Sequence, residues 1–181
     1  MRRLPHTLLY LSLALTVLAG SGASQALADE PCAGFKWDVS KERALFGSPA
    51  LSQAAGKDSV AAPGLVPNRL YRLQLLPASE VAFSVPPGKK PLIEGTYAGL
   101  AALKIPASGS YRIAVDLPLW IDVAAKGQLV PAKDYEGQQG CDAPHKIVEF
   151  DLDAKQPLLL QFSGTPEATI RLTVTRVLVG Q

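Results

Sequence analysis

The sequence predicts an all-β fold: an antiparallel β-sandwich, jelly-roll-like in arrangement, with about eight or nine strands. Apolar and polar residues alternate through many short segments, which is typical of strands that bury one face. The 181 residues include 15 Gly and 15 Pro, and these are scattered between the alternating segments, where they supply turns. No long helical pattern and no internal repeat interrupts them. We therefore expect residues 29–181 to form a single β-sandwich domain.

The alternation is clearest in the C-terminal part of the chain. The strands predicted there are residues 110–115, 119–124, 146–152, 157–164 and 168–177. The first two are joined by a short link that contains Pro118, which predicts a hairpin. In the last strand the apolar residues define an inward face, so Thr173 and Thr175 are expected to face water. Because parallel neighbours need a long crossover, the short links predict antiparallel pairing.

The N-terminal half gives weaker signals. Alternating apolar residues predict a first strand at 35–39, and residues 41–46 either extend it or form one helical turn with Ser40 as a possible N-cap. Residues 47–68 are small, polar and interrupted by proline, so we interpret them as a surface excursion. Further strands are predicted at residues 70–76, 81–85 and 99–105.

Residues 1–28 have the three parts of a cleaved secretory signal peptide. Arg2 and Arg3 give a positive start, Leu8–Ala19 is apolar, and Ala26-Leu27-Ala28 has the small-x-small pattern of a cleavage site. The alternative is a membrane anchor, but the apolar run is shorter than the roughly 20 residues that a span needs. We predict cleavage after Ala28, no transmembrane segment after cleavage, and a periplasmic or secreted protein.

The chain has two cysteines, Cys32 and Cys141, and in an exported protein an even number suggests a disulfide. The bond would tie the N-terminal segment to a long loop that we predict at residues 129–146. Reactive thiols are the alternative, but no CxxC motif is present to lower a thiol pKa.

Charge and ligand counts argue against several function classes. The chain has 18 Lys and Arg and 16 Asp and Glu, so loss of Arg2 and Arg3 with the leader gives equal numbers. No basic cluster of the kind that binds nucleic acid is visible. His145 is the only histidine after the leader and no methionine follows Met1, too few ligands for the usual copper, zinc or iron sites unless subunits share them. We predict no metal and no cofactor.

The residues that suggest binding are aromatic or polar side chains near predicted loops. Trp120 lies on the strand face opposite Leu119 and Ile121, and next to Asp122 it would suit a sugar or a peptide if that face is exposed. The alternative is that Trp120 faces the core. Tyr135 and His145 fall in the predicted 129–146 loop, together with a flexible Gly137–Gly140 run.

Residues 104–177 resemble the bacterial pre-peptidase C-terminal domain. The matching pieces are 109–115, 150–154, 158–164 and 169–175, which correspond to a G-x-Y strand, an F-x-L-x-A strand and two further strands. The family is a small jelly-roll sandwich found as an accessory domain on secreted peptidases, and some members bind calcium or matrix proteins. No peptidase precedes the matching region here, so the resemblance implies a fold and a compartment but no activity.

Two functions remain open. The first is an exported, periplasmic β-sandwich without enzymatic activity, which binds an unknown protein, peptide or carbohydrate or supports an envelope assembly. The second is a small secreted hydrolase or lyase with its site in the 129–146 loop around His145, although no G-x-S-x-G motif is present in the mature chain. Oligomerisation through an exposed strand edge is a further possibility.

Overall fold

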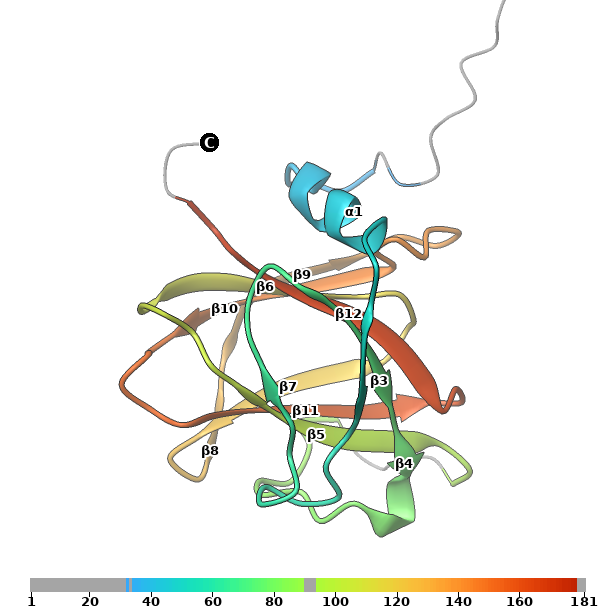
Figure 1. The fold of residues 1–181 in the computed structure, drawn as a ribbon, viewed down its shortest axis with the longest axis vertical. Coiled ribbons are helices and arrows are strands. Elements are labelled where there is room, and N and C mark those ends of the chain that lie inside the picture. The colour runs from blue at the N-terminus through green and yellow to red at the C-terminus, as the bar shows by residue number, and fades with distance from the viewer. Residues whose placement is uncertain (1–31, 33, 90–93, 179–181) are drawn as a thin grey trace, which may run out of the picture.

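The computed structural model describes residues 32, 34–89 and 94–178 and has two packed β-sheets (Figure 1). The predicted signal peptide lies outside these residues. One sheet, here sheet A, contains in spatial order β1 (Leu51–Ala54), β3 (Leu70–Gln74), β12 (Thr169–Arg176), β6 (Gly109–Val115), β10 (Lys146–Leu152) and β9 (Ala132–Gly137). The other, sheet B, contains β2 (Gly64–Leu65), β5 (Tyr97–Leu103), β11 (Leu158–Thr165), β7 (Trp120–Ala125) and β8 (Gln128–Val130), with β4 (Leu76–Pro77) also paired to β5. The predicted all-β sandwich is confirmed.

The sheets are mixed and contain more strands than expected. The central pairs are antiparallel, but β1 runs parallel to β3 and β2 runs parallel to β5. Both parallel strands come from residues 47–68, the predicted surface excursion. This segment therefore adds an edge strand to each sheet, and although β1 is exposed, Leu65 in β2 is fully buried. Short edge strands of two to four residues carry too little alternation to be recognised in the sequence.

The core lies between the two sheets and follows the predicted period of two. Its central residues come from the inward positions of β3, β6, β7, β10, β11 and β12. Tyr111, Phe150 and Phe162 are the largest fully buried side chains. Tyr111 keeps its hydroxyl satisfied there, because that hydroxyl donates a 2.7 Å hydrogen bond to the carbonyl of Ala107.

The predicted hairpin between residues 110–115 and 119–124 is wrong. β6 pairs with β10 and β12 in sheet A, whereas β7 pairs with β11 and β8 in sheet B. The link crosses from one sheet to the other, with Leu119 buried in the core. At its start Asp116 accepts hydrogen bonds from the backbone N–H and the Nε of Arg171 on β12, at 2.8 and 2.9 Å. Alternation gives the inward face of each strand but not the sheet to which it belongs.

The outer face of sheet A is covered by the N-terminal segment (Figure 1). The predicted strand at 35–39 is wrong: this stretch leads into a helix, α1 (Ser40–Phe46), and Val39, not Ser40, occupies the N-cap position without a side-chain cap. Phe35, Val39 and Phe46 pack on residues of sheet A in a second apolar cluster. Because of this cover, the outward residues Thr173 and Thr175 are buried and do not face water as predicted.

The outer face of sheet B is partly covered by residues 81–89, of which the sequence predicted residues 81–85 as a strand. The structure has no strand there, and η1 (Ala78–Glu80) precedes the segment. Gln161 on β11 holds the segment: its side chain accepts from Ser84 Oγ and the Val85 N–H and donates to the Val85 carbonyl, at 3.0 to 3.3 Å. The alternating apolar residues here belong to a covering loop. Its backbone is held by hydrogen bonds to the side chain of Gln161 and does not pair with a neighbouring strand.

Within the described residues, neither helix is long and apolar enough to cross a membrane.

Candidate functional site

A pocket of about 340 Å³ opens at one end of the sandwich, where β6 and β9 end and β7 and β10 begin. Both sheets and the 81–89 segment contribute to its wall. The lining residues are Lys89, Pro118, Leu119, Trp120, Tyr135, Gly137, His145, Lys146, Ser163 and Gly164. The volume falls in the range of pockets that hold small ligands.

Trp120, the first residue of β7, is fixed by the carboxylate of Asp122. The indole Nε1 donates to Asp122 Oδ1 at 2.9 Å, and Asp122 Oδ2 accepts from the N–H of Gly88 at 2.9 Å. A Cβ at Gly88 would lie 3.0 Å from Asp122 Oδ1 and 3.2 Å from Trp120 Nε1, which is tighter than ordinary contact, so glycine favours the close approach of the covering segment. Asp122 is buried and serves to position the indole and the segment that carries Lys89.

Two lysine ammonium groups lie over the Trp120 ring. Lys146 Nζ is 5.2 Å from the ring centroid and Lys89 Nζ is 5.9 Å from it, both within cation–π range. Lys146 Nζ also donates a 2.8 Å hydrogen bond to the Leu119 carbonyl. Burial lowers the pKa of Lys146, and the charge of Lys89 lowers it further, while the carboxylate of Asp122 raises it by a smaller amount.

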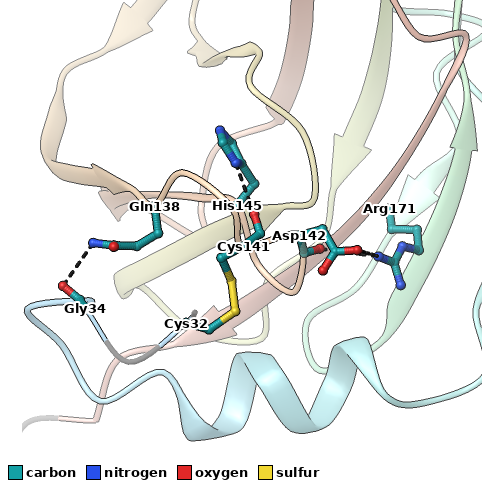
Figure 2. The surroundings of a disulfide bond; sticks show 7 residues. All are labelled: Cys32, Gly34, Gln138, Cys141, Asp142, His145 and Arg171. Carbon is teal, nitrogen blue, oxygen red and sulfur yellow. Dashed lines mark hydrogen bonds and ion pairs between the residues drawn. A yellow bond between two sulfur atoms is a disulfide. The ribbon is translucent and has the colours of Figure 1, made fainter. Parts of the chain in front are cut away.

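His145 is positioned by the loop that carries the disulfide (Figure 2). The predicted bond between Cys32 and Cys141 is present, with a Cα–Cα distance of 5.3 Å. His145 Nδ1 lies 3.1 Å from the Cys141 carbonyl, its backbone N–H donates to Val115, and its carbonyl accepts from Gln138. In Figure 2 the imidazole points away from the sulfur atoms.

Tyr135 and Ser163 complete the polar part of the wall. Tyr135 is 68% exposed on β9, the edge strand of sheet A, so its ring is free to contact a ligand. Ser163 is buried on β11, directly opposite Trp120 in the ladder with β7. The pocket thus offers two aromatic rings, two ammonium groups, an imidazole and a hydroxyl. Among the lining residues that the structure describes, none is acidic.

The structure brings together three of the residues suggested by the sequence. Trp120, Tyr135 and His145 line the same pocket, and Asp122 lies behind the indole. The first part of the predicted 129–146 loop is strand, because β8 and β9 occupy residues 129–130 and 132–137, whereas residues 138–145 form no strand. Sequence reasoning missed Lys89 and Lys146.

Two further aromatic residues that could contact a ligand, Trp37 and Tyr97, lie elsewhere. Trp37 lies beneath Lys36 and Arg112, each 4.8 Å from its ring centroid. Tyr97 borders a separate hollow next to Thr96.

In the part of the chain that the structure describes, no three His, Cys, Asp or Glu side chains gather as metal ligands would. No protein-family model matches the sequence, and no curated protein matches it. The resemblance to the pre-peptidase C-terminal domain stays a prediction.

Proposed function

We propose that this protein is an exported, non-enzymatic binding or accessory protein of the cell envelope, and that its ligand enters the pocket beside Trp120. The observation that carries the proposal is the convergence of Trp120, Tyr135 and His145 on one cavity from three separate parts of the chain. Aromatic rings bury a large area at a small entropy cost, which suits a binding surface.

Export is supported by the leader pattern in residues 1–28 and by the Cys32–Cys141 disulfide, because such bonds persist in oxidising compartments. The full-length chain is to be expressed in a Gram-negative host and recovered from separated periplasm and cytosol. We expect a periplasmic product that begins at Asp29 and is two hydrogen masses lighter than the reduced chain. Full-length cytosolic protein with two alkylatable thiols would contradict export.

The jelly-roll prediction and the family resemblance belong to the same proposal. The order β3-β12-β6-β10 in one sheet and β5-β11-β7-β8 in the other supports a jelly roll, because successive strands largely alternate between the sheets. An accessory role is what the resemblance to the pre-peptidase C-terminal domain implies.

The hydrolase or lyase alternative has less support. Among the hydrogen bonds of the described residues, none joins His145 to a serine or a carboxylate; its Nδ1 contacts only a backbone carbonyl. A triad needs its base to be oriented by a third group within hydrogen-bond reach.

Binding is tested with labelled mature protein on an array of oligosaccharides and peptides. Trp120→Ala is expected to abolish the signals that the wild type gives, because it removes the central ring of the pocket. Trp37→Ala, which removes the other tryptophan, is the matched control and is expected to keep them. An array without signals, or signals that persist in Trp120→Ala, would refute the proposed site.

A further inference from the structure

We propose that the pocket selects acidic sugars, in which a carboxylate is attached to a pyranose ring, with the carboxylate held by Lys146 and Lys89 and the apolar C–H face of the ring against Trp120. This inference rests on the proposed function and names the ligand class of the same site.

Lys146 differs from the other half-buried cationic side chains because it has no ion pair with a described residue. Of the Lys and Arg residues that the structure describes, three have an exposure between the buried and the exposed classes: Arg112, Lys146 and Arg171. Arg112 pairs with Glu149 at 3.1 Å and Arg171 pairs with Asp116 at 2.9 Å. Lys146 has no ion pair with any residue that the structure describes, and its one hydrogen bond, to the Leu119 carbonyl, leaves two N–H donors for a ligand.

The neighbouring charges make an anion favourable at this point. Lys146 and Lys89 share one indole ring, so two positive charges lie close together in a partly desolvated site. The nearby carboxylate of Asp122, whose oxygens accept from Trp120 and Gly88, offsets this only in part, because it raises the pKa of Lys146 by less than burial or Lys89 lowers it. The lowered pKa of Lys146 agrees with a desolvated ammonium that lacks a partner. An incoming carboxylate would supply that partner and raise the pKa again.

The aromatic residues indicate what the anion is attached to. Trp120 lies beside the two ammonium groups, and the exposed ring of Tyr135 lies on the opposite sheet. A ring bound against Trp120 would carry its carboxylate toward the lysines, and Ser163 and His145 would remain for ring hydroxyls. The cavity of about 340 Å³ suits a ligand of one or two rings.

The test compares phenyl β-D-glucuronide with phenyl β-D-glucoside, which differ only in a carboxylate against a hydroxymethyl group. Each is titrated into ¹⁵N-labelled mature protein while the two tryptophan indole N–H signals are followed by NMR. We expect the glucuronide to shift the Trp120 signal and to leave the Trp37 signal unchanged. Its affinity should be roughly ten-fold above that of the glucoside, because one charge-assisted hydrogen bond provides about this difference. The advantage should decrease with added salt.

Lys146→Met keeps the length of the side chain and removes its charge, so it is expected to bring the glucuronide down to the affinity of the glucoside. Lys155→Met, in an exposed turn, is the control and should change neither affinity.

Equal affinities for the two probes, or a glucuronide preference that survives Lys146→Met, would overturn the inference and leave the proposed function standing. No shift of Trp120 with either probe, while the array shows Trp120-dependent signals, would also overturn the inference alone. An empty array together with silent titrations would refute both.

Discussion

Two threonines on the outward face of β12 show that the effect of a buried hydroxyl on stability depends on whether it has a hydrogen-bond partner. Both are buried beneath α1. Thr175 Oγ1 donates a hydrogen bond to the buried carboxylate of Glu42, whereas Thr173 Oγ1 has no hydrogen-bond partner among the residues that the structure describes. A buried polar group without a partner costs about 1–3 kcal/mol, so the two residues should respond in opposite ways to the same substitution.

Thr173→Val is expected to raise the free energy of unfolding by about 1 kcal/mol, because it replaces an unpaired hydroxyl with a methyl group of similar shape. Urea titrations followed by circular dichroism measure this change. A loss of stability would show that the hydroxyl is satisfied after all.

Thr175→Val is the opposite case on the same strand face. It removes the donor and leaves the Glu42 carboxylate buried without that partner, so we expect a loss of about 1–3 kcal/mol. The same titration measures it, and Glu42→Gln in the Thr175→Val background should restore part of the loss, since a neutral amide is cheaper to bury than a carboxylate.

The sequence predicted the burial of single residues where burial depends only on the residue's position within one strand. The alternation in residues 110–115 and 146–152 predicts inward positions for Tyr111 and Phe150, and both are buried. Trp120 and His145 were singled out because aromatic and titratable residues near loops are candidates for binding. Lys146 escaped notice because its importance depends on Lys89 and Trp120, which reach the pocket from other parts of the chain. Alternation also could not show that α1 would cover Thr173.

Among the larger elements, the disulfide holds the N-terminal segment against the loop that carries His145. Gln138 strengthens the contact by donating from its side chain to the Gly34 carbonyl at 2.9 Å, as Figure 2 shows. The bond joins residues 109 apart, so its loss should cost up to about 4–5 kcal/mol on the chain-entropy estimate and commonly less.

The double variant Cys32→Ala, Cys141→Ala tests this contact by hydrogen exchange and mass spectrometry. We expect faster exchange in residues 34–46 and 138–145 and little change in β11, because the sandwich core does not depend on the bond directly. Uniformly faster exchange throughout the chain would contradict this local role.

Residues 81–89 are the corresponding cover on sheet B, and Gln161 is their main attachment. Gln161→Leu should leave the N–H and the carbonyl of Val85 without their side-chain partner and release the segment. We expect faster proteolysis within 81–89 and weaker binding at the pocket, since Lys89 is at the end of this segment. Gln156→Leu, in a turn outside the pocket lining, is the control.

Among the secondary-structure elements, the sequence predicted the interior strands, but it did not predict the two segments that cover the outer faces of the sheets. Central strands have inward apolar positions spaced by two, and these were predicted close to their true bounds. Residues 35–39 and 81–85 have the same spacing, yet both are covering segments: Phe35 and Val39 pack on sheet A, and residues 84–85 are held on sheet B by hydrogen bonds to the side chain of Gln161. Periodicity describes which side chains are buried together, and it does not specify whether the backbone pairs with a neighbouring strand.

For the whole molecule, the two covers explain where the pocket forms. The sandwich has one cover on each outer face. The disulfide ties the N-terminal cover of sheet A to the loop that carries His145, and Lys89 belongs to the cover of sheet B; His145 and Lys89 both reach the pocket beside Trp120. The sequence could predict the sandwich and the disulfide because each depends on a simple count or period. It could not predict the pocket wall, which needs the three-dimensional meeting of five chain segments.

The charges of the whole molecule predict a loss of stability in acid. Hydrogen bonds hold the pKa values of four carboxyl groups below their ordinary value of 3.8. The donors are the backbone of Ser40 for Asp38, the side chains of Lys36 for Asp134 and Ser110 for Asp151, and the backbone of Lys155 for Asp153.

Because the folded pKa values are the lower ones, the unfolded chain binds more protons between the two values, and stability must fall as the pH falls through that window. We expect the urea midpoint to stay level from about pH 7 to about pH 5 and to drop from about pH 4 downward. Hydrogen bonds are the largest cause at each site, so added salt should reduce the drop only in part. In Asp153→Asn the drop should be smaller, because one of the four titrating groups is gone; a midpoint that stays level down to about pH 2 would contradict the argument.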